Sequence, residues 1–131
     1  MQGGKKVLNN AKEDLACQDY RSEMARIIEQ VDPGAEIVDP LKRVHQKAID
    51  AGLTIEQLSA DDAMVRDAFR GVVRDAAGCD VVISNLPEPS MGSAIELWEA
   101  SASGALVLTI SPLKANWVIR STSAHNFEDF E

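Results

Sequence analysis

Residues 80–111 read DVVISNLPEPSMGSAIELWEASASGALVLTIS. The runs Val81–Ser84 and Ala105–Ile110 lack the alternation of apolar and polar residues that a half-exposed strand shows, so both predict buried strands. Between them, Ser93–Ser103 predicts a helix, which Gly104 ends. A strand, a crossover helix and a second strand form a βαβ unit, whose two strands are parallel.

The rest of the chain continues this order of strands and helices. Further strands are expected at Val7–Leu8 and Ala35–Val38, and helices at Asp19–Gln30, within Leu41–Leu58, from the N-cap Ser59 to Ala77, and at Ala115–Ser121. Buried strands that alternate with helices predict an α/β fold, a three-layer sandwich with a Rossmann- or flavodoxin-like parallel sheet and helices on both faces. A length of 131 residues suits a single domain spanning residues 1–131.

Composition and charge narrow the classes of function. The formal net charge of −8 at pH 7 argues against a surface for polymeric nucleic acid, but it still allows a local site for a small anion. The longest apolar run, Ala105–Leu108, is too short to cross a membrane, and residues 1–6 lack the apolar core of a signal peptide. We therefore expect a cytoplasmic protein with no membrane partner.

The cysteines and histidines are isolated in the sequence. Cys17 and Cys79 give neither a disulfide framework nor a metal-binding spacing. His45 and His125 stand far from each other and from the cysteines. No metal site is therefore expected.

The loop between the two buried strands is the leading candidate for a binding site, because ligands of parallel α/β folds lie at the carboxyl ends of strands. Asn85 opens this loop. Ser90, Gly92 and Ser93 allow close approach of the backbone and add hydroxyl donors, and the N–H groups at a helix N-terminus attract anions. The loop predicts a phosphate cradle, and a turn-forming role is the alternative for Ser90.

Glu96 lies in the first turn of the helix expected over residues 93–103. The helix N-terminus favours its charged form, and an ionised carboxylate at a cleft can attack a sugar carbon to form a covalent glycosyl intermediate. The spacing also fits a capping box, in which the Glu96 side chain bonds back to the Ser93 N–H. On spacing alone, the capping box is the commoner case.

The run PSMGSAIEL at Pro89–Leu97, followed by Ala100 and Gly104, resembles the active-site stretch of the nucleoside 2-deoxyribosyltransferase superfamily. Within that superfamily it is most similar to the 2'-deoxynucleoside 5'-phosphate N-hydrolases, and the close similarity spans about Asp80 to Ser111. The resemblance implies that Glu96 is the nucleophile in cleavage, or transfer, at the N-glycosidic bond of a nucleoside 5'-monophosphate or nucleoside. It also implies a homodimer and a reaction that needs no metal or organic cofactor.

The same resemblance gives expected roles to other side chains. Ser90 stands where transferases of free nucleosides carry an Asp, so a 5'-phosphate is the expected group there. Lys12 is a candidate for contact with that phosphate, and an exposed surface lysine is its alternative. Asn116 falls near a residue that reaches the phosphate site of a partner subunit in the N-hydrolases. Asn9 and Asn10 are expected to line the pocket for the base or sugar.

The chain departs from the family pattern at the position of a helix Asp that works with the leaving base, which is Val72 here. Asp75, about one turn later, is the candidate replacement as general acid, and a solvated surface charge is its alternative. The Val72 departure supports a second interpretation, a non-catalytic nucleotide-binding module on the same fold. A third is a structural α/β domain in which Glu96 only caps its helix.

Overall fold

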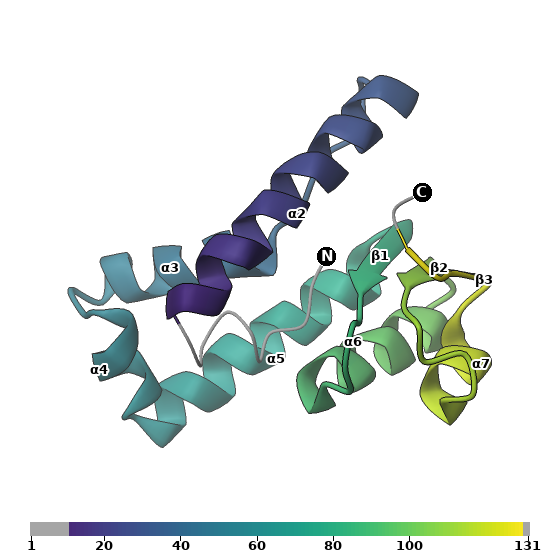
Figure 1. Cartoon of the computed structure of the whole chain (residues 1–131). Helices are drawn as coiled ribbons and strands as arrows, with labels where there is room; N and C mark the ends of the chain where they lie inside the picture. The colour runs from purple at the N-terminus through teal and green to yellow at the C-terminus, as the bar shows by residue number, and fades with distance from the viewer. Residues whose placement is uncertain (1–10, 130–131) are drawn as a thin grey trace.

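The computed structural model describes residues 11–129, with side chains from Arg21 onward (Figure 1). Its elements in chain order are α2 (Ala11–Val31), α3 (Pro40–Asp50), α4 (Ile55–Ser59), α5 (Asp62–Gly78), β1 (Val81–Asn85), α6 (Met91–Ala102), β2 (Leu106–Ile110), α7 (Trp117–Thr122) and β3 (His125–Phe127). The strand expected at Val7–Leu8 lies outside the described residues.

The three strands form one parallel sheet in the order β1-β2-β3. Residues 81–85 pair in register with residues 106–110, and residues 108–110 pair with residues 125–127. Since α6 and α7 connect successive parallel strands, the βαβ unit predicted over residues 80–111 is confirmed, and a second unit follows it directly. The protein is thus a mixed α/β fold with a small parallel sheet.

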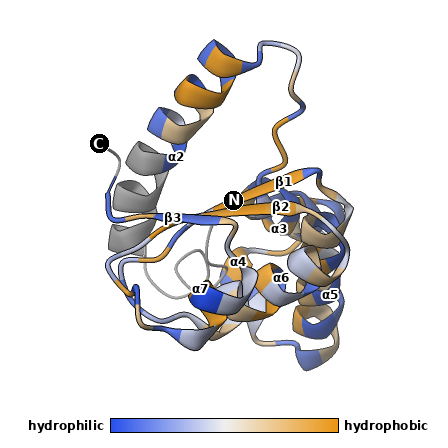
Figure 2. Cartoon of the chain, turned by 90° about the vertical axis from the view of Figure 1, so that its right-hand side faces the viewer, coloured by the Kyte–Doolittle hydropathy of each residue, from blue (hydrophilic) through white to orange (hydrophobic). Residues whose placement is uncertain are grey.

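The two faces of this sheet differ in how they are covered. The main apolar core lies between α5, α6, α7 and one face of the sheet, and its buried residues are Ala76, Val82, Leu86, Leu97, Ala100, Val107 and Ile119. Figure 2 shows α6 and α7 on one side of β1 and β2, both of which are strongly hydrophobic. Because successive strand residues point to opposite faces, the alternate residues lie on the other face. Large apolar side chains remain exposed there: Val81, Leu106 and Phe127.

A second apolar cluster holds α3, α4 and α5 together. Its buried residues are Ala48, Leu58 and Ala68. Two ion pairs connect α3 to α5 as well: Arg43 with Asp75, and Lys47 with Asp67. α5 therefore contributes to both clusters and links the helical half of the protein to the sheet.

α2 makes few of the buried contacts. Among its described side chains, Arg21 and Met24 are buried, whereas Ile27 and Val31 are exposed. Both ribbon views show its C-terminal end projecting away from the other elements. None of the helices between residues 11 and 129 combines the length and the apolar content needed to cross a bilayer.

The strand predicted at Ala35–Val38 is wrong. These residues follow the turn at 33–34 without regular structure, and no strand among the described residues pairs with them. A strand forms only where a partner supplies the other half of the hydrogen bonds, and local sequence carries no information about that partner. β3 is the converse case, since residues 125–127 become a strand because β2 offers them an edge.

The long helix predicted from Ser59 begins later than expected. Its N-cap is Asp61, whose Oδ1 accepts hydrogen bonds from the N–H groups of Ala63 and Met64 at 3.0 and 3.1 Å. Ser59 instead ends the short helix α4, which the sequence did not predict as a separate element. Ser and Asp are both favoured at the N-cap position, so sequence alone does not decide between Ser59 and Asp61.

Replacing Asp61 tests this cap. Asp61→Ala should lower the free energy of unfolding by about 1 kcal/mol, because two N–H groups of α5 lose their acceptor. Ser59→Ala is the control and should change the free energy by less than about 0.5 kcal/mol. Urea denaturation followed by circular dichroism measures both values. A larger loss for Ser59→Ala than for Asp61→Ala contradicts the assignment.

Candidate functional site

The loop after β1 ends at Ser90, which is the N-cap of α6. Its Oγ accepts a hydrogen bond from the Ser93 N–H at 3.4 Å. The helix therefore begins at Met91, two residues before the predicted start, and Glu96 lies in its second turn. Because Ser90 is the acceptor for the Ser93 N–H, the capping box between Ser93 and Glu96 does not form.

Glu96 is a buried carboxyl group. The residue is 4% exposed, and its Oε1 has no hydrogen-bond partner among the described residues. Burial raises the pKa of Glu96 to about 8, and the positive charge of Arg21 opposes part of that rise. The helix N-terminus was expected to favour the charged form of Glu96, but desolvation outweighs it, because the dipole acts mainly on the first turn of the helix.

Ser84 and Ser93 are polar residues in the same contact between β1 and α6. Ser84 alternates with Val82 and so points to the helix-covered face of the sheet. Ser93 precedes Glu96 by three positions, which places both on one side of α6. Both serine hydroxyls are buried without a hydrogen-bond partner in the described part of the chain. Unpaired buried polar atoms are rare in folded proteins, and a functional role is among their recognised causes.

Arg21 of α2 is a buried cation. It is 7% exposed, and none of its guanidinium nitrogens has a hydrogen-bond partner within residues 21–129. Asp39 lies at ion-pair distance, with 3.8 Å between Nη1 and Oδ1. Arg21 is missing from the predicted site residues, yet the sequence holds a signal for it. It shares a helix face with Met24 and Ile28, so an arginine occupies a position of the apolar stripe.

Ser90 and Asn116 line a cavity of about 390 Å³ beside the N-terminal end of α6. Most of its lining is apolar: Leu86, Pro89, Met91, Ala94, Leu97, Leu113, Val118 and Ile119. Glu96 is not part of this lining and lies about 160° around the helix from Ala94. The predicted phosphate-binding serine and the predicted nucleophile therefore face different sides of α6.

The Asn116 side chain is engaged by its own helix. Its Oδ1 accepts hydrogen bonds from the N–H groups of Val118 and Ile119 at 2.9 and 3.3 Å, which makes it the N-cap of α7. This contact accounts for the position of Asn116 within one chain. Its predicted reach into a partner subunit's phosphate site stays a prediction.

The structure describes only some of the remaining predicted binding residues. Asn85 ends β1, and strand alternation places its side chain on the face opposite to Ser84. Gly92 is the second residue of α6, beside Ser93. Two further predicted residues, Asn9 and Asn10, lie outside the described residues, as does the side chain of Lys12 in the first turn of α2.

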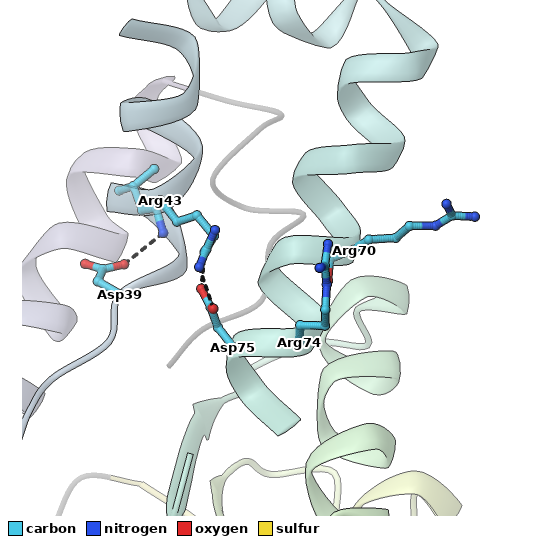
Figure 3. A network of polar contacts seen from close by, with 6 residues as sticks. Asp39, Arg43, Arg70, Arg74 and Asp75 are labelled. Carbon is cyan, nitrogen blue, oxygen red and sulfur yellow. Dashed lines mark hydrogen bonds and ion pairs between the residues drawn. The ribbon is translucent and has the colours of Figure 1, made fainter. Parts of the chain in front are cut away.

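Asp75, the predicted general acid, is bound by Arg43 of α3 (Figure 3). Nη2 of Arg43 donates to Oδ1 at 2.7 Å, and Nε donates to Oδ2. Arg70 and Arg74 lie on the other side of α5 and do not contact this pair. Val72, the position where the resemblance led us to expect an Asp, is buried. Asp75 thus connects α3 to α5, and its role as general acid stays a prediction.

The arrangement around Glu96 suits a reaction in which positive charge develops next to a carboxylate. With a pKa near 8 the group is mostly neutral at pH 7 and becomes a carboxylate above it. A desolvated carboxylate is strongly stabilised by an adjacent cation, and the oxocarbenium-like transition state of glycosyl transfer is such a cation. In its neutral form the same group can donate a proton.

The burial of Glu96 makes stability depend on pH. Its pKa rises from an ordinary 4.5 to about 8 on folding, so the stability that the bound proton contributes is complete below pH 4.5 and is lost as the pH rises through 8. We expect the unmodified protein to lose on the order of a few kcal/mol between about pH 5 and 9, and Glu96→Gln to lose much less. Denaturant unfolding of both proteins across this range measures the difference. Parallel curves contradict the burial of an ionisable Glu96.

No protein-family model, no curated protein and no solved structure matches the chain. The residues themselves establish a mixed α/β fold in which a buried carboxyl group lies on the helix that covers a parallel strand pair, within the field of a buried guanidinium.

Proposed function

We propose that this chain cleaves, or transfers, at the N-glycosidic bond of a nucleoside 5'-monophosphate or nucleoside, with Glu96 as the nucleophile. The observation that carries the proposal is the buried Glu96 carboxyl, whose Oε1 accepts no hydrogen bond from the described residues. In the first step a carboxylate oxygen bonds to the anomeric carbon while the bond from that carbon to the base breaks. The base leaves with the bonding electrons and takes up a proton from water. Water, or a second base, then displaces Glu96.

Sequence and burial support this role independently. The run Pro89–Leu97 resembles the active-site stretch of the nucleoside 2-deoxyribosyltransferase superfamily, with Glu96 at the position of the nucleophile. Burial removes the water that solvates a carboxylate, so a neighbouring oxocarbenium-like centre becomes the main stabiliser of its charge. A glutamate that serves only the fold is expected to have hydrogen-bond partners for both oxygens.

The start of α6 is the proposed site for a 5'-phosphate. The first N–H groups of a helix have no intrahelical acceptor, and the positive end of the helix dipole lies beside them. The Ser90 hydroxyl oxygen accepts from Ser93, and its own proton remains available for donation to an anion. Ser90 also lines the 390 Å³ cavity, which offers room for a phosphate, although Glu96 is not among the residues that line it.

We also propose that the sheet belongs to a three-layer sandwich of the Rossmann or flavodoxin type. The support is the apolar character of the face that the described helices leave uncovered, where Val81 and Leu106 are exposed. Parallel strands are normally covered on both faces, so a second helical layer is the expected partner of this surface.

A homodimer is part of the same proposal. Met91, Ile95 and Trp98 recur at helical spacing on the outer side of α6, and all three are exposed. A contiguous exposed apolar stripe is a common feature of subunit interfaces. Contact through this stripe would place α6, which carries Ser90 and Glu96, next to the same helix of the partner.

A nucleotide-binding module without turnover is the second candidate. Its support is the lack of a carboxyl group for protonation of the leaving base, since the expected Asp is a buried Val72. The nearest replacement, Asp75, has both oxygens engaged by Arg43. Binding of nucleotides without release of base would favour this module over the enzyme.

Removal of the Glu96 charge separates the two candidates. Glu96→Gln should reduce the release of base from 2'-deoxynucleoside 5'-monophosphates by more than about 100-fold, because an amide does not form the glycosyl ester. Glu99→Gln, at an exposed position of the same helix, is the matched control and should keep the rate. The rate of the unmodified protein should rise as the pH passes through about 8, where Glu96 ionises. Chromatography of the released base measures all of these rates.

Two outcomes of that experiment count against the nucleophile. Retained release of base in Glu96→Gln rules out attack by its carboxylate. A rate that falls as the pH rises through 8 assigns the group to proton donation instead.

Ser90→Asp tests the phosphate site. Asp is as good an N-cap as Ser, so α6 should keep its start, while the added charge repels a phosphate. We expect the Kd for a deoxynucleoside 5'-monophosphate to increase by about 10-fold or more relative to that for the free nucleoside. Ser90→Asn, a neutral cap, is the control. Calorimetric titration that shows equal affinity of the unmodified protein for both ligands contradicts the site.

A further inference from the structure

Ser111 follows the last residue of β2, at the carboxyl edge of the sheet where ligands of parallel α/β proteins bind. The residue is 0% exposed. Its N–H donates to the Phe127 carbonyl at 2.7 Å, which continues the pairing of β2 with β3 by one residue. Because buried hydroxyl groups need hydrogen-bond partners, the Ser111 side chain depends on the segments that leave the strands at this edge.

The Ser111 hydroxyl connects two loops. Its Oγ donates to the Leu86 carbonyl at 2.6 Å and accepts the Leu113 N–H at 3.1 Å. Leu86 begins the loop after β1 (residues 86–90), and Leu113 lies in the loop after β2 (residues 111–116). Within the part of the chain from residue 21 to 129, no other hydrogen bond joins these two loops. A single hydroxyl group therefore holds them together.

Proline explains why side chains take over at this edge. Leu86 precedes Pro87, and Ser111 precedes Pro112. Proline has no N–H, so regular strand pairing cannot continue through either position. Side chains bind the carbonyl groups just before both prolines: the Ser111 Oγ binds that of Leu86, and Nδ2 of Asn126 donates to that of Ser111 at 3.1 Å. Ser111 is thus fixed from the β3 side and fixes the loop after β1 in turn.

The two loops form adjoining parts of the cavity wall beside α6. The residues that they contribute to the lining are Leu86, Glu88, Pro89, Ser90, Leu113 and Asn116. Ser90, the N-cap of α6, stands four positions after Leu86, and two of the positions between them are proline. Proline restricts the backbone, so the orientation of the chain at Leu86 also constrains Ser90. The contact at Ser111 therefore affects the start of α6.

We propose that Ser111 is a positioning residue for the ligand site at the start of α6: its buried hydroxyl clamps the loop after β1 to the loop after β2, and so holds Ser90 and the first turn of α6 in place. This clamp does not depend on any ligand. Its consequence for binding rests on the proposed function, in which a 5'-phosphate meets the start of α6.

Hydrogen exchange tests the clamp without a ligand. Ser111→Ala leaves the Leu86 carbonyl without its donor and the Leu113 N–H without its acceptor. The N–H groups of Ser93 and Ala94 report on the start of α6, since they donate to the Ser90 Oγ at 3.4 Å and to its carbonyl at 3.0 Å. We expect both amides to exchange about 10-fold faster or more in Ser111→Ala, as measured by NMR, because the loss of hydrogen bonds favours local opening.

Thr109→Val is the matched control. Thr109 is also 0% exposed and lies two positions earlier in the chain, and its Oγ1 donates to Oδ1 of Asn126 at 2.7 Å instead of to either loop. This variant should keep the exchange of Ser93 and Ala94 within about two-fold. Equal acceleration in both variants assigns Ser111 to general stability and overturns the proposal, as does unchanged exchange in Ser111→Ala. If circular dichroism shows that Ser111→Ala does not fold, Ser111→Cys, a weak donor of similar size, decides by the same criteria.

Ligand binding connects the clamp to the proposed site. Calorimetric titration with the four common 2'-deoxynucleoside 5'-monophosphates should give a Kd about 10-fold higher for Ser111→Ala than for the unmodified protein, and a nearly unchanged Kd for Thr109→Val. If the exchange changes as expected but no protein binds any of the four, the clamp is supported and the proposed function fails. If the nucleotides bind equally well to Ser111→Ala and the unmodified protein, the phosphate site is supported and the positioning role fails.

Discussion

The packing of α6 against β1 and β2 is the interaction on which the rest of the structure depends. Leu97 and Ala100 are buried against the strand residues Val82 and Val107. A helix presents its residues in a fixed rotation, so burial of this face also carries Ser93 and Glu96 out of solvent. Full burial of one Leu side chain contributes about 2 kcal/mol, and several such contacts offset the penalty for a buried carboxyl. The apolar packing of α6 against the two strands therefore also places the polar side chains of Ser93 and Glu96 in the interior.

The penalty for Glu96 is large enough to shape the chemistry. A pKa shift from 4.5 to about 8 corresponds to roughly 5 kcal/mol between its two protonation states. The ionisation of a carboxyl group with this shift changes strongly when a cation comes close, whether that cation is a guanidinium or a developing oxocarbenium ion. Exposed carboxylates such as Glu99 are solvated by water and lack this sensitivity. Two features therefore determine how readily Glu96 ionises: its burial, and the absence of hydrogen bonds to its Oε1 within residues 21–129.

Sequence predicted the parts of the fold that depend on local pattern. The unit β1-α6-β2 follows from two apolar runs and a helix that Gly104 ends, and Gly104 adopts the φ of +90° that favours glycine. Features set by distant partners were missed, such as the pairing of β3 with β2. The same division holds for the site. The motif made Glu96 a candidate, whereas the burial of Arg21, 75 positions earlier in the chain, depends on tertiary packing.

The two consecutive βαβ units lead us to expect a particular order of folding. Paired residues of β1 and β2, such as Val81 and Leu106, are 25 positions apart, and Leu108 and His125 are 17 apart. Loops of this length close quickly, so the sheet and its helices can assemble from neighbouring segments. α2 comes from far earlier in the chain and adds few buried contacts. We therefore expect it to dock last, so that the electrostatic environment of Glu96 is completed only when folding ends.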